Sequence, residues 1–256
     1  MTKRTAIVTG GLTGIGLASA EKLQAAGHLV ALGSRRGNKN ELEAAKARKI
    51  LGPDVLIGRL DVSEEQSISD FVGQVTHQLG KPTILVNSHG IFIEANILGH
   101  ADKAWFEQID INLNGVFRMI RAVFPGMVSE GHGRIVNISS TAAHVGAEGY
   151  AAYCASKAGV NGLTKAVAIE GAPHNITCVS ISPTFVETPM MDAAAKRMAD
   201  ATRNTPGVMK EKLKGTNPQG RLVQPEEVAS LVEFCCSDGA PALTNEDIQV
   251  NAGALW

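Results

Sequence analysis

The chain is poor in the residues on which several large classes of protein depend. It has only four cysteines in 256 residues, and aromatic residues make up 4% of the chain. The cysteines show no CxxC spacing and no histidine at metal-ligand spacing; they are Cys154, Cys178, Cys235 and Cys236. A disulfide scaffold needs more cysteines in a shorter chain, and a zinc site needs paired ligands. We therefore expect buried free thiols and no metal.

The chain also lacks an excess of either positive or negative charge, and it lacks long apolar runs. The 24 Lys and Arg residues nearly balance the 25 Asp and Glu residues, which leaves no field to hold a nucleic acid. No apolar run approaches the ~20 residues that span a bilayer. Residues 1–5 lead into a strand-like segment without the apolar stretch of a signal peptide. We expect a cytoplasmic protein without nucleic-acid or membrane partners.

What the chain does have is an alternation of short apolar runs with longer segments of helical period. Strands are predicted over residues 6–8, 29–32, 55–60, 84–86, 134–138, 176–181 and 248–250. Helices are predicted over residues 15–26, 41–51, 102–128, 151–172 and 225–236, with another that opens at a capping box over 63–66. Such an alternation needs crossover connections, and these favour a mostly parallel sheet covered on both faces.

The sequence therefore predicts one α/β domain over residues 1–256, of the Rossmann type, doubly wound around a seven-stranded sheet. No linker or shift of composition divides the chain. Residues 188–220 are polar and show no strong period. Because this segment is long, we expect it to form a mobile lid over a substrate.

A glycine-rich turn follows the first predicted strand and opens the first helix. Glycines let the backbone turn sharply and approach a pyrophosphate, and a helix amino terminus offers unpaired N–H groups. Any tight turn also favours glycine, but this one lies at the strand–helix junction where parallel sheets bind nucleotides. The residues of the turn expected to bind a cofactor are Gly10, Leu12, Thr13, Gly14, Ile15 and Gly16.

The end of the second strand bears on the choice of cofactor. An NAD site places an acidic residue near this point to bind the ribose 2′-hydroxyl. Here the chain has Ser34, Arg35 and Arg36, and an arginine fork can bind a 2′-phosphate. Two arginines after a strand are also typical of a solvated loop. We favour NADP(H) over NAD(H) because no carboxylate is present to repel the phosphate.

Two tyrosines are present in the chain, and one of them has a suggestive neighbour. Tyr153 precedes Lys157 by four residues, a spacing that places both side chains on one face of a helix. A phenol with a pKa of about 10 is a poor base at neutral pH, and a nearby ammonium favours the phenolate. The spacing fits a general acid/base with its lysine, and it fits an ordinary tyrosine beside a surface lysine equally well.

Together these motifs resemble the short-chain dehydrogenase/reductase family along the whole chain. Asn112 and Ser140 stand where the family has its catalytic asparagine and serine, and Ser140 precedes Tyr153 by thirteen residues. The resemblance implies that Tyr153 exchanges a proton with the substrate oxygen and that Ser140 hydrogen-bonds that oxygen. It also implies that Lys157 lowers the pKa of Tyr153 and binds the nicotinamide ribose, and that Asn112 holds a water that links Lys157 to solvent.

The resemblance implies further contacts with the cofactor. Asp61 and Val62 resemble the adenine-contacting pair, and Thr188 takes the place of the residue that holds the nicotinamide carboxamide. The implied set is Asp61, Val62, Asn87, Gly90, Tyr153, Lys157, Pro183, Val186 and Thr188. The chain departs from the family where His89 replaces a small residue and where Thr184 replaces a glycine. We expect a packing role for His89.

The substrate is left open by the sequence. The pocket is expected to be walled by residues 91–94, by residues 141–149 and by the segment from residue 185 onward. The resemblance implies hydride transfer between NADP(H) and a ketone or secondary alcohol, with a 3-oxoacyl or polyketide-type thioester as the alternative substrate. A nucleotide-sensing regulator on the same fold is a second alternative, which the complete catalytic set opposes. The family also implies a homo-oligomer, a tetramer or a dimer, built on helices 102–128 and 151–172.

Overall fold

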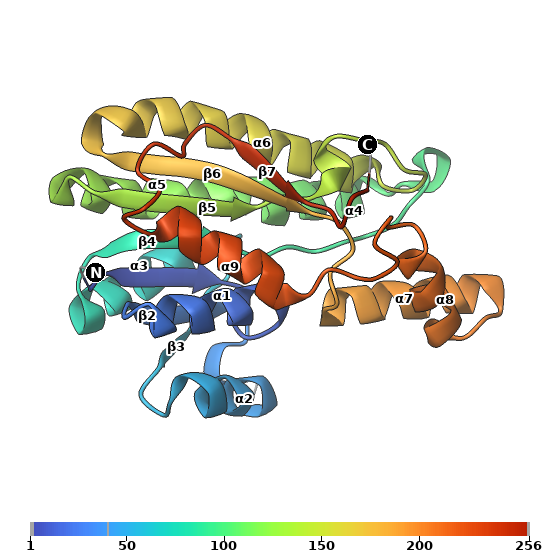
Figure 1. The fold of residues 1–256 in the computed structure, drawn as a ribbon, viewed down its shortest axis with the longest axis horizontal. Helices are drawn as coiled ribbons and strands as arrows, with labels where there is room; N and C mark the ends of the chain where they lie inside the picture. Colours follow the sequence, from blue (N-terminus) through green and yellow to red (C-terminus); the bar gives the residue numbers. More distant parts are fainter. Residues whose placement is uncertain (1–2, 40, 255–256) are drawn as a thin grey trace.

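Seven parallel strands form the centre of the molecule (Figure 1). The computed structural model describes residues 3–39 and 41–254. The strands are β1 (Thr5–Thr9), β2 (Leu29–Ser34), β3 (Leu56–Arg59), β4 (Pro82–Asn87), β5 (Gly133–Ile138), β6 (Ile176–Pro183) and β7 (Asp247–Val250). Their order is β3-β2-β1-β4-β5-β6-β7, and each of these pairings is parallel. The predicted Rossmann-type fold is confirmed.

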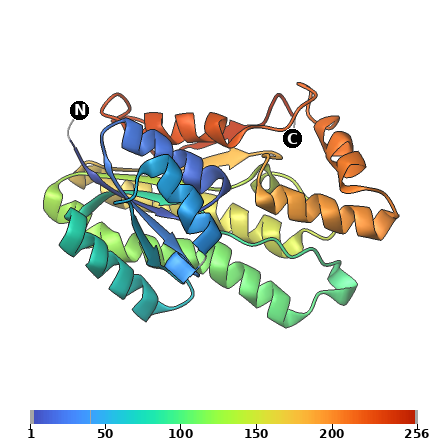
Figure 2. The same ribbon diagram turned by 90° about the horizontal axis from the view of Figure 1, so that it is seen from below.

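Helices cover both faces of the sheet, as Figure 2 shows from below. One apolar core lies between the sheet and α1 (Gly14–Ala25), α2 (Glu41–Leu51) and α9 (Pro225–Cys236). The other lies between the sheet and α3 (Glu65–Leu79), α5 (Gly115–Glu130) and α6 (Ala151–Gly171). Parallel strands buried on both faces become continuous apolar runs, which is why the strands were visible in the sequence.

The long helix predicted around residues 102–128 is present, with one distortion: α4 (Asp102–Ile109) continues into α5 through a π-helical turn, Asp110–Asn114. A second local prediction is wrong. The expected capping box at Ser63 does not form, because α3 begins at Glu65 and Ser63 instead donates to the Asp61 carboxylate from its backbone N–H and its hydroxyl. The carboxylate at the end of β3 thus competes successfully for the groups that would have capped the helix.

The segment expected to be a lid without a strong period contains two helices, α7 (Pro189–Thr202) and α8 (Pro206–Lys214). Each helix begins with the same N-terminal cap: a threonine hydroxyl accepts a hydrogen bond from a backbone N–H of the first turn, and proline follows at the first helical position. An isolated bridge between Val186 and Val223 joins the two ends of the segment. In Figure 1 the two helices stand to one side of the sheet.

Other expectations have simple outcomes. The four cysteines are free, and three of them are buried while Cys154 is partly exposed. No helix of the described residues is long and apolar enough to cross a membrane. The prediction that no signal peptide is present rests on residues 1–5, of which Met1 and Thr2 lie outside the described residues.

Candidate active site

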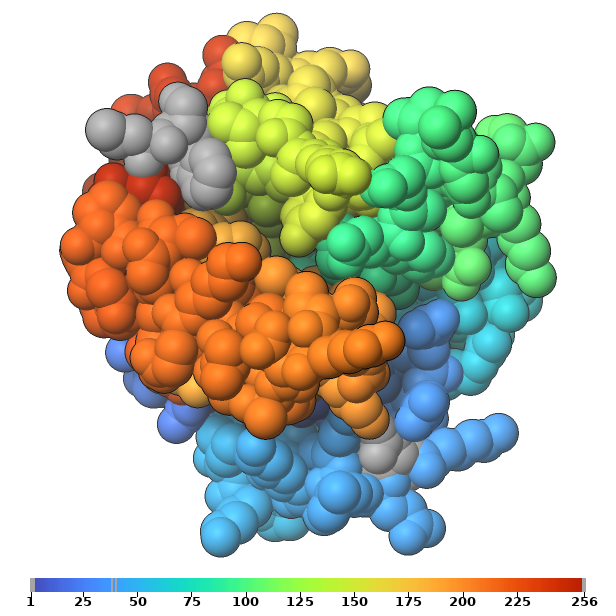
Figure 3. Space-filling model, turned by 90° about the vertical axis from the view of Figure 1, so that its right-hand side faces the viewer, coloured from blue at the N-terminus to red at the C-terminus, as the bar shows by residue number. Residues whose placement is uncertain are grey.

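A cavity of about 810 Å³ lies at the carboxyl ends of the central strands. Its walls come from the ends of β1, β4, β5 and β6, the first turn of α1, and the start of α7. In Figure 3 the molecule is hollowed between three segments: α7–α8, the loop at residues 141–149, and the stretch after β4. The crevice where the chain reverses its direction of winding is the usual ligand site of such sheets.

The glycine-rich turn forms one end of this cavity. Gly10 has a φ of 62°, and a Cβ there would lie 2.9 Å from the Ser88 carbonyl oxygen. Gly14 has a φ of 52° and lies against Thr188, which brings the turn and the start of α7 together. Thr13 precedes α1 without capping it through its side chain, so the first N–H groups of the helix remain available to a phosphate.

The loop after β2 lies beside the end of β3. The Ser34 hydroxyl oxygen accepts from the Gly37 backbone N–H at 3.0 Å, and its own proton is left to donate elsewhere. Arg35 lines the cavity and is close enough to Asp61 for their charges to interact. Burial acts to raise the pKa of Asp61, but the Ser63 hydrogen bonds and the Arg35 charge hold that pKa below its usual value. Arg36 is exposed and does not line the cavity.

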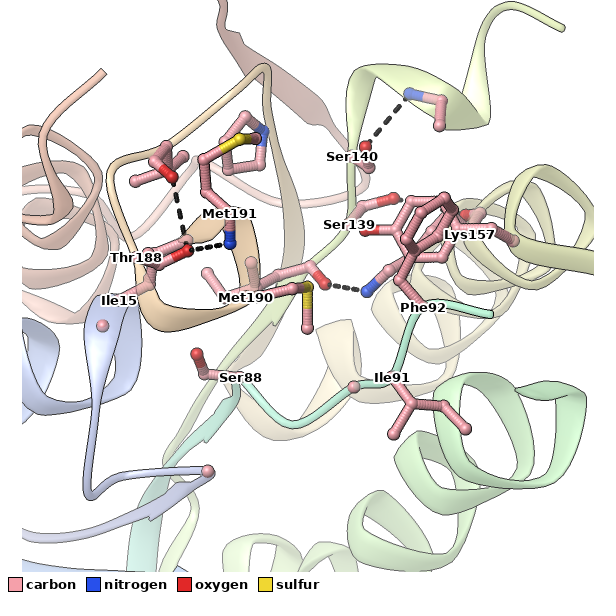
Figure 4. A pocket seen from close by; sticks show the side chains of 18 of the residues that line it. Ile15, Ser88, Ile91, Phe92, Ser139, Ser140, Lys157, Thr188, Met190 and Met191 are labelled. Carbon is pink, nitrogen blue, oxygen red and sulfur yellow. Dashed lines mark hydrogen bonds between the residues drawn. The ribbon is translucent and has the colours of Figure 1, made fainter. Parts of the chain in front are cut away.

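Ser140, Tyr153 and Lys157 meet in the cavity wall. Ser140 follows β5 and hydrogen-bonds the Tyr153 phenol, while its Oγ also accepts from the Ala142 backbone N–H. Lys157 is 5% exposed, and its Nζ donates to the Ile138 carbonyl at 2.8 Å. The same Nζ lies 5.8 Å from the centre of the Tyr153 ring. Figure 4 shows Ser140 and Lys157 on the side of the cavity opposite Ile15 and Thr188.

Burial dominates the acid–base behaviour of this group. It raises the pKa of Tyr153 to about 12, against the effect of the Ser140 hydrogen bond. It lowers the pKa of Lys157 to about 8. Lys157 is not among the groups that shift the pKa of Tyr153 here, so its predicted effect on the phenol stays a prediction. The phenol carries its proton at neutral pH.

Asn112 lies in the π-helical turn and is fully buried behind the cavity. Its amide accepts from the Ile91 backbone N–H at 2.8 Å and donates to the Ile91 carbonyl at 2.9 Å. It also lies 3.2 Å from the Ser156 hydroxyl. The Asn112 side chain thus holds the stretch after β4 in place, and its role in holding a water stays a prediction.

The structure does not bring all the predicted cofactor residues into the cavity. Of the described residues, those that line it include Gly10, Thr13, Gly14, Ile15, Ser34, Arg35, Asp61, Val62, Gly90, Tyr153, Lys157, Pro183, Val186 and Thr188. Leu12 is in the core, and Gly16 faces the Gly10 carbonyl within the turn. The Asn87 amide donates to Asn137 on the neighbouring strand. These three residues shape the site from behind, since their side chains or Cα atoms point into the protein.

His89 packs under the cavity floor, in the role expected for it. Its ring is mostly buried, with Nε2 inaccessible to solvent, and Nδ1 lies 2.6 Å from the Thr9 hydroxyl. The Nε2 side faces Gly115, where a Cβ would come within 2.9 Å of it. Burial, with the Lys157 charge as a smaller cause, lowers the pKa of His89 to about 3. The imidazole is neutral at physiological pH.

The other half of the cavity is apolar and aromatic. The Phe92 ring lies 4.6 Å from the Tyr150 ring and 5.1 Å from the Tyr153 ring, centre to centre. Arg197 of α7 lies over the outer face of Phe92, at 5.6 Å. The sequence predicted walls over residues 91–94, over residues 141–149 and from residue 185 onward, and the last of these segments supplies Met190, Met191, Thr216 and Pro218; the sequence did not single out Ala254 near the end of the chain.

Comparisons with known proteins agree with this geometry. A family model described as enoyl-(acyl carrier protein) reductase matches residues 10–254. The chain belongs to the short-chain dehydrogenase/reductase family. It is 39% identical to a putative ketoacyl reductase of the monensin polyketide synthase of Streptomyces virginiae, over 98% of this chain and 97% of that protein.

Other short-chain dehydrogenase/reductase relatives cover the chain as fully. Acetoacetyl-CoA reductase of Rhizobium meliloti is 39% identical over 99% of both proteins. The 3-oxoacyl-[acyl-carrier-protein] reductase of Pseudomonas aeruginosa is 36% identical over 98% of this chain and 96% of that protein. A solved structure of an actinorhodin polyketide ketoreductase variant with NADPH superposes with a TM-score of 0.93, at 34% identity over 98% of this chain and 97% of that one. The chain is therefore an NAD(P)-dependent oxidoreductase that acts on carbonyl groups.

Proposed function

We propose that this enzyme is an NADPH-dependent ketoreductase in which Tyr153 gives a proton to the substrate oxygen. The observation that carries the proposal is the hydrogen bond between Ser140 and Tyr153 in the wall of a nucleotide-sized cavity, with Lys157 beside them. The bound nicotinamide supplies the hydride. A phenol whose pKa burial raises to about 12 stays protonated at neutral pH, so it is poised to donate in the reducing direction.

Several side chains of the protein have separate roles in the proposed reaction. Ser140 lies beside the Tyr153 phenol, and its hydroxyl can donate to a carbonyl oxygen placed next to Tyr153, where charge develops as the hydride arrives. Lys157 is held by the Ile138 carbonyl at a point where its charge faces the cavity. Asn112 fixes the backbone at Ile91, which forms the facing wall. These residues orient the carbonyl and move one proton.

The preference for NADPH over NADH rests on the loop after β2. Ser34 and Arg35 line the cavity where the 2′ position of an adenosine would lie, and neither is acidic. Asp61 is the nearby carboxylate, and its charge is already engaged by the Ser63 hydrogen bonds and Arg35. A 2′-phosphate would thus meet a free hydroxyl proton and a guanidinium.

The lining of the cavity also narrows the substrate. Among the described residues that line it, the charged ones are Arg35, Asp61 and Lys157, of which the first two belong to the nucleotide end. Phe92, Tyr150 and the methionines of α7 make the other end apolar. We infer an uncharged ketone with an apolar body, as a free compound or as a 3-oxoacyl thioester of the kind that the relatives' names indicate. A free 3-oxo acid would bury its carboxylate without a partner.

The lid is part of the same proposal. Thr188 caps α7 and touches Gly14, so the start of the lid contacts the cofactor turn. Arg197 and Phe92 join the lid to the substrate wall. Movement of α7 about the Val186–Val223 bridge would open the cavity, and closure would exclude water from the carbonyl.

The test is a ketone panel followed by loss of NADPH absorbance. The panel contains acetoacetyl and longer 3-oxoacyl thioesters, neutral diketones and aryl ketones, and free acetoacetate as the charged counterpart. We expect turnover of neutral ketones or thioesters with NADPH and none of acetoacetate. Tyr153→Phe should abolish turnover and leave NADPH binding, measured by nucleotide fluorescence, intact. Binding of NADPH with no turnover across the panel would instead support a nucleotide sensor.

A further inference from the structure

The loop that follows Ser140 is joined to the far edge of the sheet by a hydrogen bond between two side chains. His144 Nε2 lies 2.7 Å from Asp247 Oδ2, although the two residues are 103 positions apart in the chain. Asp247 opens β7, and its side chain is only 10% exposed. The His144 ring faces β7 and α6, where it meets Asp247 and Asn161.

The carboxylate is held firmly by its own strand neighbours. The hydroxyls of Ser180 and Ser182 on β6 both donate to Asp247 Oδ1, at 2.6 and 2.7 Å. The His144 ring bonds the other oxygen, and the Asn161 amide lies 3.5 Å from the same ring nitrogen. Hydrogen bonds to a carboxylate are stronger than those between neutral groups. Asp247 is therefore a rigid anchor whose orientation is fixed from within the sheet.

The same geometry excludes a second catalytic centre here. In a hydrolytic triad the serine bonds the histidine, which takes its proton. Here both serine hydroxyls bond the carboxylate, and the histidine is the third donor to that group. No serine hydroxyl is placed to give its proton to His144, so the cluster is structural and links the loop to β7. We call the bond between His144 and Asp247 the tether.

The tether holds the loop that forms one wall of the substrate half of the cavity. Residues 141–149 begin next to Ser140, and Val145, Gly146 and Ala147 line the cavity. Gly149 has a φ of 76°, and a Cβ at Gly146 would meet open space. Glycine backbone restricts a loop little. The far end is held by hydrogen bonds from the Ala95 backbone N–H to the Gly149 carbonyl and from the Asn96 amide to Glu148, and Cys154 Sγ donates to the Val145 carbonyl. The His144 side chain is an anchor between these two ends.

We propose that His144 is a positioning residue for the ketone: its bond to Asp247 sets the place of the loop at residues 141–149, and through it the Ser140 hydroxyl and the apolar wall. The inference rests on the proposed reductase function. The glycine-rich turn and the loop after β2, which form the cofactor end of the cavity, are separate segments of its wall, so loss of the tether should act on the ketone and spare NADPH.

The decisive variants are His144→Ala and His144→Gln, with His77→Ala on the exposed face of α3 as the matched control. Glutamine can place an amide N–H where Nε2 stands, and so can restore the bond to Asp247. We expect His144→Ala to lower kcat/KM for the ketone about 10- to 100-fold, to leave the NADPH dissociation constant within about twofold, and to be largely rescued in His144→Gln. In a double-mutant cycle, His144→Ala should add little to Asp247→Ala.

Amide hydrogen exchange over residues 141–149 gives a second readout that needs no turnover. Exchange should accelerate in His144→Ala and stay near the unchanged protein in His144→Gln and His77→Ala. If the unchanged protein reduces ketones and His144→Ala keeps its kcat/KM, the inference is wrong while the function stands. If no ketone is reduced, the function fails, and unchanged exchange in His144→Ala would separately refute the tether. Equal losses of NADPH binding and ketone turnover would show a general structural role and also overturn it.

Discussion

The buried histidine under the cavity floor should make the protein sensitive to mild acid. His89 is mostly buried, and burial lowers its pKa from 6.5 to about 3. The folded state therefore takes up a proton at His89 at a lower pH than the unfolded state does. The stability that depends on neutral His89 is fully present above pH 6.5, is lost progressively as the pH falls towards 3, and falls no further below that.

The size of the effect follows from the two pKa values. One pH unit across this interval corresponds to about 1.4 kcal/mol, so the full loss is about 5 kcal/mol. Between pH 7.5 and pH 5 the His89 contribution is about 2 kcal/mol. That is a large share of the 5–15 kcal/mol by which domains are typically stable.

The assay is equilibrium unfolding by urea at pH 7.5 and at pH 5, for the unchanged protein, His89→Gln and His89→Ala. The variants will be less stable at pH 7.5, since they lose the bond to Thr9 or leave a cavity. Their loss of unfolding free energy between the two pH values should be smaller than that of the unchanged protein by about 2 kcal/mol. His77→Ala should behave as the unchanged protein does. Equal pH dependence in all four proteins would refute the assignment of the acid sensitivity to His89.

Three further predictions concern activity and assembly. Ser34→Asp should shift the ratio of kcat/KM values towards NADH, and an unchanged ratio would show that this loop does not contact the 2′ position. Since burial lowers the pKa of Lys157 to about 8, ketone reduction should fall above that pH as the ammonium is lost; a flat profile to pH 10 would contradict this. We also propose a homo-oligomer, a tetramer or a dimer, because Phe106, Phe117 and Ile169 are 64%, 45% and 65% exposed on α4, α5 and α6; a monomer by light scattering would refute it.

The parts of the site that could be predicted are those in which neighbours in sequence are neighbours in space. The glycine-rich turn and the Tyr153–Lys157 pair each occupy one turn of chain, so spacing alone places their groups together. Ser140 needed the family pattern, because nothing local to it indicates that β5 ends beside α6. The same dependence on distant chain explains why the sequence did not single out Ala254 as part of the cavity wall.

The failures have physical causes as well. The π-helical turn at Asn112 follows from where the helix must present an amide to Ile91, and a helical period does not reveal one extra residue. The helices of the lid bury a narrow stripe of small and sulfur-containing side chains, such as Ala195 and Met209, which gives a weak periodic signal. The pKa of Tyr153 depends on how much water its neighbours exclude, and burial is a property of the folded chain.

The bridge between Val186 and Val223 has a consequence for how this enzyme can change. It brings the two ends of a long excursion side by side, with α7 and α8 lying wholly between them. Altering the length of such an excursion changes the entropy of closing it only slowly, and the strands β6 and β7 on either side keep their own pairing. The segment between the two valines should therefore be replaceable as a unit. Replacing it with the corresponding segment of a relative should change the enzyme's ketone preference to that of the relative and leave its nucleotide preference unchanged.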